Sequence, residues 1–436
     1  MKNRSNSSRL RGLYKLKVAE RRTLIAEAAG MPVAELGAAL DAGGLTPETA
    51  DKFVENVLGT YALPFGVALN VRVNGKDYIV PMVVEEPSVI AAASNASKMV
   101  RAGSGFIADV DPSIMTCQVQ LFDVPEEGAG AADILLEKDT LLAMANRAIP
   151  GLVERGGGAR DLEVRNLDGG MLVVHIYVDC KDAMGANLVN NVAEAVGDRI
   201  AELSGGKRGL RILSNLCDRR CVRVKAQVPV HALSTDTHGG GLVIDGIVNA
   251  SRFAEVDPYR AATHNKGIMN GIDAVCVATG NDWRAVEAGA HAFAARTGAY
   301  RPLATWRAAR DKNGAEVLEG SLELPLALGS VGGTLRVHPA ARLALRLLGV
   351  TSSAELATIA ASVGLASNLA AIRTLATDGI QRGHMSLHAR SVAAAAGADG
   401  TEVEQVASAI VDARDITIEG ATRALRAMRT GFEKDS

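Results

Sequence analysis

The chain is poor in aromatic residues and carries almost no net charge. Phe, Trp and Tyr make up 3% of its 436 residues, too few for a surface on which nucleic-acid bases stack. The 47 basic and 49 acidic residues give a formal net charge of −2, without the basic excess of a nucleic-acid-binding protein. We therefore expect no nucleic-acid partner.

Long apolar runs are also scarce. By inspection, no continuous run approaches the roughly 20 apolar residues that a membrane-spanning helix needs. The N-terminal segment "MKNRSNSSRLRG" is basic and Ser-rich, but it lacks the apolar centre of a secretory signal. A transit peptide is an alternative, although acidic and apolar residues typical of an ordinary helix soon follow. We expect an exposed tail, no membrane contact and a cytoplasmic location.

Cysteine and histidine give little support for a metal site. Five cysteines are scattered, and only Cys217 and Cys221 lie close together. One such pair without a second is a weak zinc signal, so we expect reduced, mostly buried thiols. His384 and His388 have the i, i+4 spacing of one helix face, but no H-E-x-x-H pattern or third ligand accompanies them. We predict no metal.

The elements that are present indicate an α+β chain. With 48% apolar residues, it has the material for about two to four domains. Asn74-Gly75 between two alternating runs predicts a β-hairpin. After residue 112, strand-like and helix-like segments alternate, including one predicted helix over residues 131–149 and two strands around Asp168. We interpret this region as a compact inserted α+β domain. We expect the C-terminal half that follows it to be mostly helical.

Two adjacent acids raise the first question about chemistry. Glu85 and Glu86 separate the apolar run ending at Val84 from the small-residue segment that follows Pro87. Proline and acids are favoured at the beginning of a helix, so the pair is explained by a simple helix start. A working acid at this position is the alternative.

A second candidate is "DAMGANLVNN", where a predicted strand gives way to a helix. Asp182 can cap that helix, while Gly185 and Ala186 allow a ligand phosphate to approach its N-terminus. The segment is not G-x-G-x-x-G. A capped helix with small packing residues remains the alternative.

Two further segments carry isolated charged residues. Lys266 stands among polar residues and glycines in "THNKGIMNGID", unlike a lysine on a solvated helix face. Asp282 precedes a helical run in "ATGNDWRAVEAGAH", where a simple N-cap is an equally good explanation. The remaining histidines are taken as structural; they are His175, His231, His238, His264, His291 and His338.

Taken together, these segments carry a family resemblance. "ENVLGTYALPFG", "VVEEPSVIAAAS", "DAMGANLVN", "LRILSNL", "THNKGIMNGIDAV", "ATGNDWRAVEAGAHAFAARTG" and "GIQRGHMSLHAR" closely resemble hydroxymethylglutaryl-CoA (HMG-CoA) reductase of the soluble bacterial and archaeal class II. The resemblance extends in order from about Leu13 to Phe432.

The resemblance implies a fold and an assembly. A large, mainly helical substrate domain (1–112 and 219–378) would contain an inserted small cofactor domain (113–218), ferredoxin-like and non-Rossmann with an antiparallel sheet. A helical flap (379–436) would follow. The family forms an obligate homodimer, possibly a higher oligomer, with active sites shared between subunits.

The implied activity is the interconversion of HMG-CoA with mevalonate and coenzyme A by two successive hydride transfers from NAD(P)H. By resemblance, Lys266 stabilises the developing oxyanion and Asp282 pairs with it. His384 protonates the departing thiolate, and Glu86 donates a proton to the aldehyde. Two alternatives remain: another acyl-CoA-handling enzyme on the same scaffold, and a binding protein without activity.

The resemblance also implies which residues bind the substrate and the cofactor. Those resembling substrate contacts are Ser88, Asn215, Arg260, Thr263, Asn270 and His388. Those resembling cofactor contacts are Asp182, Met184, Gly185, Ala186, Asn187, Arg147 and Ile149.

The sequence departs from the family pattern in two places. NADH-using relatives place an acid shortly after the Asn-Arg pair, whereas this chain has Ala148, Ile149 and Pro150; we therefore favour NADPH slightly over NADH. Ser367 stands where a glutamine is expected, so a polar contact to substrate is lost or replaced by water.

Overall fold

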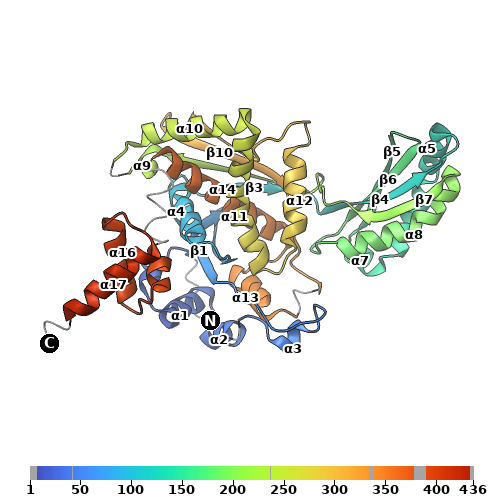
Figure 1. The fold of residues 1–436 in the computed structure, drawn as a ribbon. Helices are drawn as coiled ribbons and strands as arrows, with labels where there is room; N and C mark the ends of the chain where they lie inside the picture. Colours follow the sequence, from blue (N-terminus) through green and yellow to red (C-terminus); the bar gives the residue numbers. More distant parts are fainter. Residues whose placement is uncertain (1–6, 42, 236, 334–336, 378–388, 433–436) are drawn as a thin grey trace.

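The computed structural model describes residues 7–41, 43–235, 237–333, 337–377 and 389–432 (Figure 1). It is a mixed α/β structure with two separate sheets. His384 and His388 lie outside the described residues.

A six-stranded sheet organises the larger part of the chain, in the order β2-β1-β3-β8-β10-β9. Neighbouring strands are antiparallel except β1 and β3. The strands are β1 (Phe65–Val73), β2 (Lys76–Val83), β3 (Phe106–Val110), β8 (Cys221–Pro229), β9 (Ala304–Arg310) and β10 (Glu316–Pro325). The strands β9 and β10 were not expected, because they lie in the half of the chain that we predicted to be mostly helical. Charged residues on their partly exposed sides hide the strand pattern.

The predicted hairpin is confirmed. Asn74 and Gly75 both have positive φ, 50° and 81°, as a two-residue type I′ turn requires. Val73 pairs with Lys76 across it. The hairpin delivers the end of β2 to the two acids that follow.

Helices pack on this sheet and bury its main core, which includes Phe106, Trp306 and Met82. The covering helices are α4 (Val89–Ala102), α9 (Val230–Leu233), α10 (Gly240–Val256), α11 (Pro258–Ala278), α12 (Trp283–Ala294), α13 (Pro339–Leu348) and α14 (Ser353–Ala376). By length and composition, α14 would pass as a membrane span, so the sequence contains a longer apolar segment than inspection suggested. However, 83% of its apolar window is buried inside the protein, as in a core helix.

Packing between α11 and α14 explains Ser367. A Cβ built on Gly271 of α11 would lie 2.5 Å from the Ser367 hydroxyl oxygen, and Ser367 is 6% exposed. This side chain therefore faces the neighbouring helix α11. The close approach of the helices leaves no room for glutamine.

The second sheet has four antiparallel strands in the order β5-β6-β4-β7. It projects away from the larger sheet, with its helices on one side (Figure 1). Its own core contains Met115, Leu121 and Ile176. The elements are β4 (Ile114–Phe122), α5 (Glu127–Leu136), α6 (Lys138–Arg147), α7 (Pro150–Glu154), β5 (Gly158–Leu167), β6 (Met171–Asp179), α8 (Ala186–Ser204) and β7 (Lys207–Leu213). The chain thus follows a β-α-β-β-α-β order.

One helix predicted in this region is two. The segment 131–149 breaks at Glu137, whose φ and ψ are −90° and 10°. The break changes the chain direction, so that α5 and α6 both pack against α8.

The ends of the chain form smaller clusters. Leu13, Ile25 and Leu36 join Leu347 in one of them, and Val406, Ile410 and Leu425 form another. The N-terminal elements are η1 (Leu13–Lys15), α1 (Val18–Ala29), α2 (Val33–Leu40) and α3 (Pro47–Ala50), and the C-terminal helices are α16 (Glu402–Asp412) and α17 (Ile418–Phe432).

Candidate active site

The turn between β2 and α4 has an unusual backbone. Ser88 is the N-cap of α4 with φ 75°, in the left-handed region, which costs a non-glycine residue about 1–3 kcal/mol. The helix begins at Val89, so Pro87 and the two acids precede it. A helix start alone therefore does not explain Glu85 and Glu86. Backbone strain of this kind concentrates at functional sites.

Glu86 forms an ion pair with Lys266 of α11. The Lys266 Nζ donates to Glu86 Oε2 at 2.9 Å. The two side chains keep 59% and 38% of their surface exposed. The structure thus brings together two of the predicted catalytic residues from segments far apart in the sequence.

The predicted substrate residues of α11 share one face with this lysine. Thr263, Lys266 and Asn270 stand at i, i+3 and i+7. Thr263 and Lys266 are exposed and Asn270 is half-buried. Arg260, one turn earlier, is half-buried, and this burial lowers the pKa of its guanidinium. The face is polar and reachable by a ligand.

His264 lies on the buried side of the same helix. It is 1% exposed, and its Nε2 lies 3.0 Å from the carbonyl oxygen of Ala304. Burial lowers the pKa of His264 to about 4, so the ring is neutral and Nε2 carries the donated proton. The structural interpretation of this histidine is confirmed.

Asp282 is the N-cap of α12. Its Oδ1 accepts a hydrogen bond from the backbone N–H of Ala285 at 3.2 Å and lies 3.5 Å from Arg284 Nη2. The helix-cap interpretation is therefore correct. Along α11, the rise from Lys266 to Ala278 is about 18 Å at about 1.5 Å per residue. Among the described residues, Lys266 pairs with Glu86 and Asp282 with Arg284, and the single chain shows no ion pair between Lys266 and Asp282.

The loop before α8 is packed closely against the small core. Gly185 is the N-cap of α8 with φ 108°. A Cβ built on it would lie 2.5 Å from the Cys180 sulfur, so only glycine fits. After it, Ala186 is half-buried and Asn187 is exposed.

Asp182 does not cap α8, contrary to the prediction. Its Oδ1 accepts from the backbone N–H of Ser353 at the beginning of α14, at 2.9 Å. Sequence reasoning missed this contact because Ser353 is 171 residues away. Asp182 joins the loop of the small sheet to the larger part of the chain.

The other predicted cofactor and substrate residues differ in how exposed they are to solvent. Arg147 is exposed at the end of α6, whereas Ile149 is 3% exposed and packs in the small core. A side-chain contact from Ile149 to a ligand is therefore not supported. Met184 is half-buried, and Asn215 is exposed in the loop after β7.

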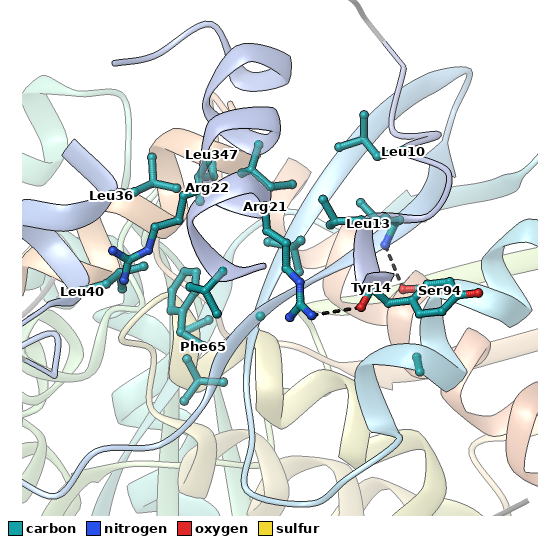
Figure 2. Close-up of a pocket in the computed structure, with 18 of the residues that line it drawn as sticks. Leu10, Leu13, Tyr14, Arg21, Arg22, Leu36, Leu40, Phe65, Ser94 and Leu347 are labelled. Carbon is teal, nitrogen blue, oxygen red and sulfur yellow. Dashed lines mark hydrogen bonds between the residues drawn. The ribbon is translucent and has the colours of Figure 1, made fainter. Parts of the chain in front are cut away.

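A cavity that sequence reasoning missed lies beside the strained turn. Its volume is about 1240 Å³, and it extends between the N-terminal segment, β1 and α4. Apolar side chains of α2 and β1 lie across from Tyr14 and Ser94 (Figure 2). Its basic lining residues are Arg9, Arg11, Arg21, Arg22 and Lys98. The basic N-terminal segment was the only sequence signal for it.

The cysteines have the environment that the sequence predicted. All five cysteines are free and buried, as predicted. Within the described ranges, no three His, Cys, Asp or Glu residues are grouped in a way that would hold a metal ion.

Known proteins resemble this chain over most of its length. Residues 17–389 match the family model of hydroxymethylglutaryl-coenzyme A reductase. The 3-hydroxy-3-methylglutaryl-coenzyme A reductase of Archaeoglobus fulgidus is 48% identical over 430 residues, which cover 98% of this chain and 96% of that protein. A probable reductase of the same name from Borreliella burgdorferi is 34% identical, covering 78% of this chain and 77% of its own length.

Solved structures of the same family also superimpose on this chain. The 3-hydroxy-3-methylglutaryl-coenzyme A reductase of Streptococcus pneumoniae superimposes with a TM-score of 0.81 at 42% identity, over 96% of this chain and 99% of that one. A class II structure from the same organism, bound to NADPH in open conformations, gives a TM-score of 0.80 at 43% identity, over 84% and 99%. The chain belongs to the hydroxymethylglutaryl-coenzyme A reductase family.

Proposed function

We propose that this protein reduces HMG-CoA to mevalonate and coenzyme A, using two equivalents of NAD(P)H, in isoprenoid metabolism. The observation that carries the proposal is the Glu86–Lys266 ion pair beside a strained turn, within a chain that belongs to this family. The pair offers a fixed cation and a carboxyl group at one place, and the reaction needs both.

Lys266 stabilises the negative charge that develops on the substrate carbonyl oxygen. A fixed ammonium acts there without reorganising. Glu86, at 2.9 Å from this ammonium, is placed to donate the proton that converts the aldehyde intermediate to the alcohol. Both groups are exposed in the single chain, which leaves room for substrate.

Asp282 would complete the site from a second subunit. Within one chain Lys266 pairs with Glu86, and Asp282 pairs with Arg284. An obligate homodimer with shared active sites, possibly within a higher oligomer, explains how the two residues act together. In a two-fold dimer each chain contributes Lys266 to one site and Asp282 to the other.

His384 would protonate the coenzyme A thiolate as the hemithioacetal breaks down. Histidine titrates near neutral pH and suits this role. His384 belongs to the C-terminal segment 379–436, which we propose as a flap that closes over bound substrate. His388 in the same segment would contact the coenzyme A side.

The substrate would lie along the exposed face of α11. Thr263, Asn270 and Arg260 flank the reacting carbonyl, and Ser88 and Asn215 complete the polar contacts. The neighbouring cavity, with its arginines and apolar wall (Figure 2), suits coenzyme A. Its size accommodates a large ligand, and its positive charge complements phosphates.

The small domain (113–218) would bind the nicotinamide cofactor, and residues 1–112 and 219–378 would form the substrate domain. Gly185 is the N-cap of α8, and the N–H groups at this N-terminus attract phosphate. Asp182, Met184, Ala186 and Asn187 belong to the same loop. Two cofactor molecules would bind in succession, and each would supply one hydride.

We favour NADPH. Arg147 is exposed at the end of α6, where a cation would attract a 2′-phosphate. No acid follows it. The NADPH-bound relative from Streptococcus pneumoniae supports this preference. We also propose a cytoplasmic location, without a metal, nucleic-acid or membrane partner.

The activity is tested by stoichiometry. Purified protein is mixed with HMG-CoA and NADPH or NADH, and the cofactor oxidised is counted per coenzyme A thiol released. Two nicotinamides per thiol are expected, with NADPH oxidised faster. Thiol release without oxidation would indicate another acyl-CoA enzyme on this scaffold and would contradict the proposal.

A further inference from the structure

Two consecutive arginines between β7 and β8 have opposite environments. Arg219 is exposed: its side chain keeps 49% of its surface and contacts Glu163 and the Tyr177 ring. Arg220 is 2% exposed. Burying a guanidinium is costly unless its donors are satisfied, so the partners of Arg220 indicate what this burial serves.

Arg220 donates to the loop that precedes α8. Its Nη1 lies 3.3 Å from the carbonyl oxygen of Ala183 and 3.1 Å from that of Met184. Its Nη2 donates to the carbonyl oxygen of Leu328 at 2.5 Å and to the Ser353 hydroxyl at 3.4 Å. One side chain thus joins three segments distant in the sequence.

The same loop is also bonded to α14 and to the segment after β10. Ser353 Oγ donates to the carbonyl oxygen of Lys181 at 3.0 Å, and its N–H donates to the Asp182 carboxylate. The N–H of Ser330 donates to the carbonyl oxygen of Asp182 at 2.9 Å. Every residue from Lys181 to Met184 is therefore bonded to the larger part of the chain or to Arg220.

This set of contacts also reaches the turn that carries Asp282. The Asn281 side chain bonds both backbone groups of Gly329, at 3.1 and 2.7 Å. A Cβ built on Gly329 would lie 2.7 Å from the Met184 nitrogen, so the two backbones are in contact. The position of Met184 is thereby set relative to Asn281 and the adjoining Asp282.

We propose that Arg220 is a positioning residue: its guanidinium holds the loop Lys181–Met184 in register with the Asp282 turn. Through this loop it sets where the nicotinamide cofactor binds relative to the reacting groups. The effect on cofactor binding rests on the proposed function of the loop. Lysine cannot replace Arg220, because a single ammonium does not reproduce a fork that donates from two nitrogens in fixed directions.

The test compares Arg220→Lys with Arg219→Lys, the matched change at the adjacent exposed position. Hydrogen–deuterium exchange is measured on peptides covering residues 181–189, and the NADPH dissociation constant and the KM for HMG-CoA are measured on the same full-length proteins. For Arg220→Lys we expect faster exchange in these peptides and roughly tenfold weaker NADPH binding. The KM for HMG-CoA should change little, and Arg219→Lys should resemble the wild type.

A milder variant covers the case in which Arg220→Lys does not fold. Ser353→Ala removes the hydroxyl that contacts both Arg220 and Lys181, and it should give the same changes to a smaller degree. Unchanged exchange at residues 181–189 in a folded variant would overturn the proposal. Faster exchange with unchanged NADPH affinity would support the role of Arg220 in holding the loop. It would contradict the proposed binding of the cofactor by this loop.

Discussion

The Lys266 ammonium lies 2.9 Å from a carboxylate oxygen of Glu86, although 180 residues separate them in the sequence. The pair joins α11 to the turn after β2, where Ser88 has a left-handed backbone. An exposed pair of this kind adds only about 0–1 kcal/mol to stability. Its presence beside a strained turn therefore points to chemistry rather than to folding.

Lys266→Ala should abolish turnover and leave the melting temperature close to that of the wild type. Removing a group that stabilises an oxyanion costs about 10²–10³-fold in kcat or more. Steady-state kinetics and thermal unfolding measure the two effects. Lys76→Ala is the control for activity, because Lys76 of β2 also pairs with a carboxylate, that of Glu355 in α14. Comparable activity loss in both variants would contradict the role of Lys266.

His384→Gln should impair the reduction of HMG-CoA more than the reduction of free mevaldehyde. Only the thioester reaction expels a thiolate, and only that step needs this proton donor. Rates are measured with both substrates under saturating NADPH. If both rates fall by the same factor, His384 does not have the role proposed for it.

Gly185→Ala should disrupt the loop before α8. The added methyl would meet the Cys180 sulfur at 2.5 Å, and alanine is disfavoured at φ 108° by about 1–2 kcal/mol. We expect weaker NADPH binding and a lower melting temperature. Gly169→Ala is the control, since it has a positive φ of 78° with open space around it. Gly169→Ala has the same unfavourable backbone conformation but no steric clash. Equal changes in NADPH binding and melting temperature for the two variants would therefore contradict a role for close packing at Gly185.

Asp273→Asn should change how stability depends on pH. Burial, together with the neighbouring Glu287 carboxylate, raises the pKa of Asp273 to about 8. The folded chain therefore favours the protonated carboxyl, and this contribution is lost as pH rises from about 4 to about 8. The variant stays neutral, so its melting temperature relative to the wild type should increase across that window. Asp245→Asn on the exposed side of α10 is the control; a pH-independent difference for Asp273→Asn would contradict the prediction.

Local patterns predicted the elements that depend on near neighbours. The Asn74-Gly75 hairpin and the strands around Asp168 formed as expected, because their turn chemistry is local. The break at Glu137 was missed, since it depends on how two helices share α8. The strands β9 and β10 were missed because partly exposed charged positions interrupt their apolar pattern.

The site was predictable only in part, because local sequence patterns mark unusual residues but do not show which distant residues meet. Glu86, Lys266 and Asp282 were recognised as unusual from their surroundings in the sequence. The ion pair between Glu86 and Lys266 was not predicted, because it depends on contacts between distant segments. Asp182 bonds Ser353 of α14 rather than its own helix, and Ile149 points into a core. The large cavity arises from segments that meet only in the folded chain.

The central claim is that Lys266 and Asp282 act together across two subunits. The most direct test mixes two inactive variants, Lys266→Ala and Asp282→Ala, unfolds or dissociates them together, and measures activity after reassembly. Shared sites predict recovery of about a quarter of wild-type activity, because a mixed two-fold dimer has one intact site. No recovery, with mixed dimers shown to be present, would mean that each chain builds its own site and would contradict the account.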